Sequence, residues 1–351
     1  SWTEAARELR LWPLPGSGIS EVKTLSLPES FLVTALVFDP KARYVFVVGD
    51  RDQGWIVPID GSTPRQLQGF SEDAMLMAAA VSPSGRLVAT AFWYGQGEKT
   101  LRVWNLETGE LRRFDLPAGE TPARAATGSP TGYEGGIANM AFVGESVLFT
   151  AGHGGLRRWN LETGLHEVVA EAPPGSSIMY GSFRDDAGVV VTADYPFGRE
   201  RSCQQALLHD LAAGTSRQLT RFGDCGTWNP LTVAVDPSGT VAATGSVDGI
   251  VRIGRLSGGD PHLLLGHKGA VNRIAISRDL RWISTSGEDN TLRLWSMPDL
   301  SKPPLHTLPR SELLDKLRSL TNLRLVRDPS SGTGWKLEVG PFPGWSEVPT
   351  W

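Results

Sequence analysis

The chain has 351 residues and a net charge of −4, with 40% hydrophobic and 21% charged residues, as in ordinary globular proteins. A nucleic-acid partner requires a basic surface, so this near-neutral charge argues against nucleic-acid binding. No apolar run approaches the roughly 18 residues that cross a bilayer, and no secretory signal is visible. We therefore expect a soluble, cytoplasmic protein without membrane contact.

Turn-forming residues divide the chain into many short pieces. Its 40 glycines and 24 prolines indicate many turns, and the apolar stretches between them are as short as single strands. Length alone suggests two domains, but internal repeats override that expectation. The sequence therefore predicts an all-β chain.

One pattern of about 40 residues occurs six times. Each copy predicts an apolar strand, a tight turn, a strand of small residues, a second turn, a strand of the form x-Arg-x-Trp and a final strand. The six units lie near residues 35–70, 78–118, 138–172, 180–222, 232–266 and 273–308. A four-stranded unit cannot bury both of its faces alone, so the units are expected to stack around a ring.

The two ends of the chain suggest a seventh unit. Residues 8–27 contain a third-strand motif and one further strand, and residues 322–340 have the pattern of a hairpin. Together these four strands would make a seven-bladed propeller, with ring closure by N- and C-terminal strands that removes exposed sheet edges. The alternative is that the N-terminal strands end a blade that begins in upstream sequence.

A short helix is predicted after the sixth unit, over residues 311–320. Ser311 can cap it, and four leucines fall on one face that should pack against the ring. These leucines are Leu313, Leu314, Leu317 and Leu320. Residues 341–351, rich in proline and aromatic residues, are expected to form an extended strap. The whole of residues 1–351 is thus expected to form a single domain.

The sixth unit carries a characteristic set of residues: Gly266 and His267 before its first strand, Thr285, Asp289 and Trp295. With this set, the chain resembles the WD-repeat (WD40) β-propeller family along nearly its whole length. The resemblance implies a buried hydrogen-bond network of His267, Thr285, Asp289 and Trp295, because a buried imidazole and carboxylate need partners. The chain also resembles the C-terminal WD40 modules of larger bacterial signalling proteins, which implies a docking or sensing role.

The other units keep only part of this set. The third strand ends in Trp159 in the third unit, but in His209 in the fourth and Gly254 in the fifth. We interpret His209, His153 and His267 as structural. No second ligand at metal-binding spacing accompanies them, so no metal is expected.

The large departures from the repeat fall on one face of the expected ring, where second turns and connections between units open. Loops on a rigid scaffold often carry binding sites, and aromatic and Arg side chains dominate interface energies. We therefore predict a partner-binding surface at Trp93, Tyr94, Tyr133, Tyr195, Phe197, Arg199, Arg201 and Trp228. The alternative is that these loops fold back and bury their own aromatic residues.

The two cysteines, Cys203 and Cys225, fall on this same face of the fourth unit. A disulfide between them is geometrically possible. Two reduced thiols are the alternative, which a cytosolic chain favours.

The sequence contains no recognisable catalytic fingerprint. Neither a G-x-S-x-G elbow, an H-E-x-x-H motif nor a Gly-rich phosphate loop is present, so we predict no enzyme activity and no cofactor. The predicted function is that of a monomeric scaffold for protein partners. Two alternatives remain: a propeller that senses a small molecule in its central channel, and a propeller hydrolase.

Overall fold

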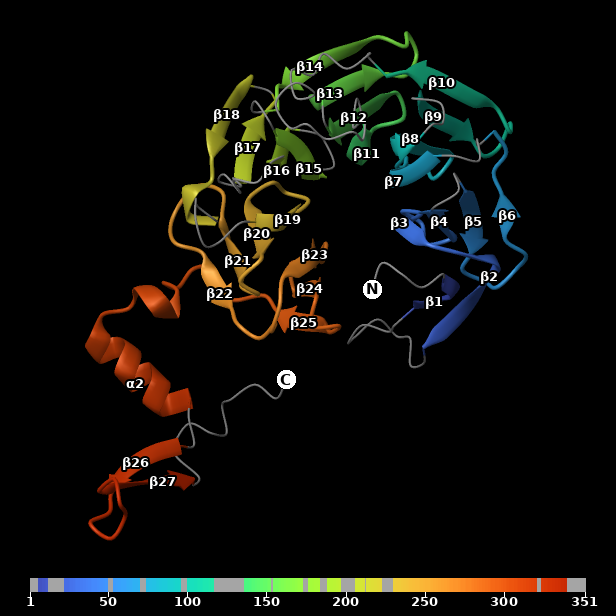
Figure 1. Ribbon diagram of the computed structural model, residues 1–351. Helices are drawn as coiled ribbons and strands as arrows, with labels where there is room; N and C mark the ends of the chain where they lie inside the picture. Colours follow the sequence, from blue (N-terminus) through green and yellow to red (C-terminus); the bar gives the residue numbers. More distant parts are fainter. Residues whose placement is uncertain are drawn as a thin grey trace.

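Six β-sheets surround a central opening in the computed structural model of the protein (Figure 1). The structure describes residues 6–11, 22–49, 53–69, 74–95, 100–116, 136–152, 154–172, 176–183, 188–196, 206–211, 213–222, 230–320 and 323–339. We number the sheets as blades 1 to 6 in chain order.

The strands of each blade follow one another along the chain. Blade 1 consists of β3 (Val33–Phe38), β4 (Tyr44–Gly49), β5 (Gly54–Pro58) and β6 (Arg65–Gln66). Blade 2 consists of β7 (Ala74–Val81), β8 (Leu87–Gly95), β9 (Thr100–Asn105) and β10 (Leu111–Asp115). Blade 3 consists of β11 (Ile137–Val143), β12 (Val147–Gly152), β13 (Gly155–Asn160) and β14 (His166–Ala170). Blade 4 consists of β15 (Ser176–Phe183), β16 (Val189–Pro196), β17 (Ala206–Asp210) and β18 (Thr215–Gln218), followed by a 3-10 turn, η1 (Thr220–Phe222). Blade 5 consists of β19 (Pro230–Val235), β20 (Val241–Ser246), β21 (Val251–Arg255) and β22 (His262–Leu264). Blade 6 consists of β23 (Val271–Ile276), β24 (Trp282–Gly287) and β25 (Leu292–Ser296).

Each blade is an antiparallel meander whose first strand lies nearest the central opening (Figure 1). The first turn of a blade contains a position in the left-handed backbone region. Gly85 (φ 71°) and Gly239 (φ 67°) occupy it in blades 2 and 5, whereas Ala42 (φ 53°) and Leu280 (φ 56°) occupy it in blades 1 and 6. Gly85 is needed for a second reason, because a Cβ atom there would overlap the Asp39 carboxylate of blade 1.

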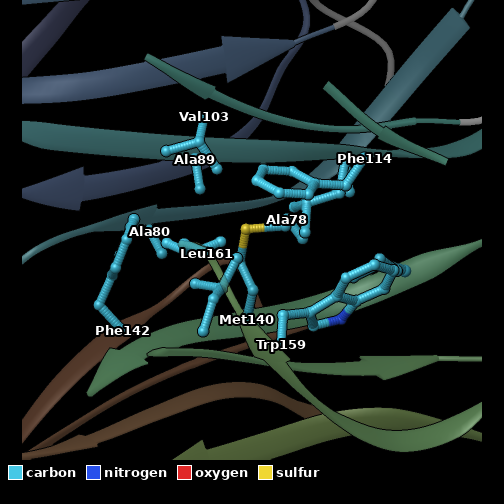
Figure 2. Close-up of a cluster of buried hydrophobic side chains, with 13 residues drawn as sticks. Ala78, Ala80, Ala89, Val103, Phe114, Met140, Phe142, Trp159 and Leu161 are labelled. Carbon is cyan, nitrogen blue, oxygen red and sulfur yellow. The ribbon is translucent and has the colours of Figure 1, made fainter. Parts of the chain in front are cut away.

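The core lies between the faces of neighbouring blades. Between blades 2 and 3, alanines of blade 2 such as Ala78 and Ala89 leave room for Met140, Phe142 and Trp159 of blade 3 (Figure 2). Small residues facing large ones let two sheets interdigitate without voids. Stacking of blades thus supplies the burial that one blade cannot provide.

Blade 1 is covered on both faces, which explains why the apolar run of β4 does not alternate with polar residues. Val45 and Val47 pack with Leu25 and Leu27 of a separate hairpin, while Phe46 and Val48 face blade 2. That hairpin pairs β1 (Ala6–Leu11) with β2 (Lys23–Phe31).

The predicted seventh blade is wrong: six blades form within the described residues. The N-terminal strands β1 and β2 pair with each other, and β26 (Leu323–Arg327) pairs with β27 (Trp335–Val339) in a second, separate two-stranded sheet. The second hairpin lies outside the ring of blades (Figure 1). Each hairpin pairs strands that are close in sequence, whereas joining strands from opposite ends of the chain carries a larger loop-closure cost.

Blade 6 has three strands, although the repeat predicts a fourth. The segment after β25 contains Pro298, Pro303 and Pro304, which lack the N–H groups that a fourth strand would donate. It leads instead through a 3-10 turn, η2 (Leu305–Thr307), into the helix α2 (Arg310–Leu320).

The helix begins one residue before the predicted start. Leu314, on the face expected to pack, is 41% exposed, so this leucine is not covered by the ring. The predicted strap at residues 341–351 lies outside the described residues.

Candidate functional site

A buried hydrogen-bond chain links four residues of blade 6. His267 Nδ1 lies 3.0 Å from Asp289 Oδ1, and His267 Nε2 lies 2.8 Å from Thr285 Oγ1. Trp295 Nε1 donates to the same Thr285 hydroxyl at 2.9 Å. Because the carboxylate can only accept, Nδ1 carries the imidazole hydrogen and Nε2 accepts from the hydroxyl.

Asp289 anchors the second turn of blade 6. Burial alone would raise its pKa, but hydrogen bonds from His267, the Lys268 backbone N–H and Thr291 outweigh burial and hold the pKa well below its usual value. Every group of this chain is thus satisfied by another part of blade 6 or its entry turn. The arrangement fixes the strand register of blade 6.

The same threonine position is used in blades 3 and 4. In blade 3, Trp159 Nε1 donates to Thr150 Oγ1 at 2.9 Å. In blade 4, the His209 imidazole replaces the indole, with Nε2 at 2.8 Å from Thr192 Oγ1 and Nδ1 at 2.8 Å from Ser216 Oγ. Burial lowers the pKa of His209 to about 4, so this histidine is neutral at physiological pH.

Blade 5 has neither ring at this position. Thr244 Oγ1 donates to the backbone carbonyl of Phe222 at 2.7 Å. The Phe222 ring, 3% exposed, lies against Gly254, where a Cβ atom would approach it to 3.3 Å. A phenylalanine from the preceding turn therefore fills the space that an indole fills elsewhere.

Hydrogen bonds also join neighbouring blades at the first turns. Arg43 of blade 1 forms an ion pair with Asp39 at 2.6 Å and donates to the Ser84 carbonyl of blade 2 at 3.0 Å. The Ser84 backbone N–H and hydroxyl donate to the Glu145 carboxylate of blade 3 at 2.8 and 2.9 Å. These contacts were not predicted from the sequence, although the Arg that ends the first turn DPKAR was a signal for the contact from blade 1 to blade 2.

The predicted partner-binding residues are only partly described. Trp93 and Tyr94 lie in the last part of β8, and Tyr195 lies in the last part of β16. Since β8 and β16 are the second strands of their blades, these residues lie on the same face of the ring. Five others, and both cysteines of the possible disulfide, fall outside the described residues: Tyr133, Phe197, Arg199, Arg201, Trp228, Cys203 and Cys225.

A central cavity of about 850 Å³ runs along the first strands of all six blades. Its wall is largely apolar, formed by Val, Ala, Leu, Met and Ile side chains, and Arg273 is the one charged residue among the described residues that line it. Hydroxyl groups in the wall already join blades: Thr34 donates to the Leu76 carbonyl at 2.5 Å, and Ser182 accepts from the Val235 N–H at 2.8 Å. This geometry is suited to a mainly apolar ligand.

Within the described ranges, no three His, Cys, Asp or Glu side chains come together in a way that could hold a metal ion. Nor does the described part of the chain contain a helix long and apolar enough to cross a membrane.

Six antiparallel meanders around a central opening define a β-propeller. The family model described as "WD domain, G-beta repeat" matches residues 222–253 and 259–296, which include the strands of blade 5 and blade 6. The matched repeats and the six-bladed ring together support a WD40 β-propeller, a fold that is typically a protein-interaction scaffold. No curated protein matches the sequence significantly.

Proposed function

We propose that this propeller is a non-catalytic scaffold that binds protein partners, as the docking or sensing module of a larger bacterial signalling protein. The observation that carries the proposal is the placement of Trp93, Tyr94 and Tyr195 at equivalent strand ends of blades 2 and 4. Aromatic residues gathered on one face of a rigid ring are typical of protein interfaces. The family likeness supports the same general role.

The partner surface is proposed to include the insertions next to these strand ends, with Tyr133, Phe197, Arg199, Arg201 and Trp228. The test is affinity capture from a lysate of the source organism with the wild type and a Trp93→Ala/Tyr195→Ala/Trp228→Ala variant. We expect a protein retained by the wild type to be lost by the variant. A Leu165→Ala variant is the matched control, because Leu165 is 71% exposed in a turn on the opposite face.

Retention of the same partner by wild type and triple variant would contradict the proposed surface. Circular dichroism and thermal unfolding of the variant must match the wild type for this comparison to hold.

The central cavity favours a second candidate function, the binding of a small molecule. A volume of about 850 Å³ and a mainly apolar wall are within the range of ligand pockets. Native mass spectrometry of the purified protein should then show an added mass that disappears on denaturation. A spectrum that shows only the mass of the chain, from protein purified without extensive dilution, would argue against a resident ligand.

A further inference from the structure

A groove between blades 2 and 3 opens among the short turns, on the face opposite the predicted partner-binding residues. We call it the blade 2–3 groove; its volume is about 270 Å³. The floor is apolar, formed by Val103, Phe114 and Leu161, which are 5%, 8% and 4% exposed. Phe114 is held from below by an edge-on contact with Trp159, with ring centres 6.4 Å apart. The floor is therefore a fixed part of the inter-blade core.

The rim of the groove carries three carboxylates, Glu110, Glu145 and Glu162, and one guanidinium, Arg112. Among these four residues, three negative charges against one positive charge leave a net charge of −2, and Arg86 beside the rim also acts electrostatically on Glu145. The Arg112 guanidinium carbon lies 5.2 Å from the centre of the Phe114 ring, so this cation stacks on one aromatic ring of the floor.

Glu145 is held in its ionised form. Burial alone would raise its pKa, but the backbone and hydroxyl hydrogen bonds from Ser84 outweigh burial and lower the pKa below its ordinary value. Its place on the rim is thus fixed by a contact from blade 2 to blade 3.

Glu110 and Glu162 are exposed, and neither forms an ion pair with another described residue. Glu107 occupies the same place in the blade 2 turn NLETG that Glu162 occupies in the blade 3 turn. Glu107 lies 3.9 Å from Arg86, whereas Glu162 faces the groove. The carboxylates of Glu110 and Glu162 are therefore available to a partner.

We propose that the blade 2–3 groove binds a lysine or arginine side chain presented by a partner protein. The methylene stem of such a side chain covers an apolar floor while its head stays at the polar rim. Glu110, Glu145 and Glu162 then complement the positive head, and charge complementarity of this kind selects against acidic and neutral residues. This surface goes beyond the proposed function, since it lies on the other face of the ring and specifies the partner's chemistry.

The test uses the full chain and three small probes followed by amide NMR: the N-acetyl methylamides of lysine, arginine and norleucine. Norleucine has the lysine stem without the charge. We expect saturable shifts at the amides of Glu110, Ser146 and Glu162 with the lysine and arginine probes, and not with norleucine. A Glu110→Gln/Glu162→Gln variant should bind the basic probes about tenfold more weakly, because it loses two rim charges.

A Glu171→Gln/Glu312→Gln variant is the control, since it changes the net charge equally at two exposed sites outside the groove. Its affinity for the basic probes should stay within about twofold of the wild type, because screening weakens distant charges. Equal shifts with norleucine, no shifts with any probe, or equal weakening in both variants would each overturn the proposal. The probes need no partner, and the mutated residues lie on the face opposite the predicted partner-binding residues. The outcome is therefore independent of the affinity-capture experiment.

Discussion

His209 Nε2 lies 2.8 Å from Thr192 Oγ1, so an imidazole in blade 4 makes the contact that an indole makes in blades 3 and 6. The register explains the equivalence. His209 pairs with Val190, as Trp159 pairs with Leu148, and the threonine follows two residues later on the second strand in both blades. In these three blades the register places the ring at the threonine hydroxyl, whereas Trp104 of blade 2, in the same register, donates to the Gln68 carbonyl instead.

The first prediction concerns pH. The pKa of His209 is lowered from 6.5 to about 4 by burial, so the folded state keeps the ring neutral while the unfolded state takes up a proton below pH 6.5. The contribution of His209 to stability is therefore complete above pH 6.5 and is lost as pH falls from 6.5 towards 4. We expect up to about 3 kcal/mol of the free energy of unfolding to be lost over this range.

Urea unfolding at pH 7.5 and 4.5 measures this effect, with His209→Gln as the test variant and the exposed His306→Gln as its control. His209→Gln should flatten the pH dependence, and His306→Gln should not. If the stability of His209→Gln depends on pH in the same way as that of the wild type, other groups cause the pH dependence.

The second prediction concerns the hydroxyl at the centre of the blade 6 network. Thr285→Val removes the partner of both His267 Nε2 and Trp295 Nε1. Leaving two polar groups without a bond should lower the free energy of unfolding by about 2–4 kcal/mol. Thr244→Val in blade 5 is the matched control, because it removes a single bond to the Phe222 carbonyl and should cost about 1 kcal/mol. Equal losses in the two variants, measured by chemical denaturation, would contradict a central role for Thr285.

The third prediction tests how blade 5 replaces the missing indole. Gly254→Trp restores the residue expected from the repeat, yet the space beside Gly254 is occupied by Phe222 and Pro261. The substitution should therefore destabilise the protein by about 1–3 kcal/mol through overpacking. Combining it with Phe222→Ala should recover part of this loss. If Phe222 does not fill that space, thermal unfolding should show that the losses of stability from the two substitutions add.

The fourth prediction concerns the buried ion pair of blade 5. Arg252, whose side chain is 4% exposed, lies 2.9 Å from Asp248. Asp248→Ala leaves a buried cation without this carboxylate and should cost about 3 kcal/mol or more. The double variant Asp248→Ala/Arg252→Met should be more stable than Asp248→Ala alone, because no buried charge then remains. A double variant that is less stable than the single one would show that Arg252 has sufficient other partners.

The sequence was informative where structure depends on neighbours along the chain. The turns DPSGT and SPSGR contain the Gly239 and Gly85 that accept a positive φ, and short apolar strands flank both turns. The grouping of His267, Thr285, Asp289 and Trp295 followed from the resemblance of the sixth unit to a WD repeat. By contrast, the placement of the side chains of Trp93 and Tyr195 stays a prediction.

The sequence by itself therefore determined the all-β character and the repeat, because a strand and a tight turn are specified within one repeat unit. Its resemblance to WD repeats indicated the residues of the blade 6 network. Only the tertiary structure decided that the two terminal hairpins stand apart, that Phe222 fills the space at Gly254, and that Glu110, Glu145 and Glu162 surround one groove. These features join residues from different blades or from distant parts of the chain. Such contacts depend on how packed sheets are placed relative to one another, which no local pattern of residues encodes.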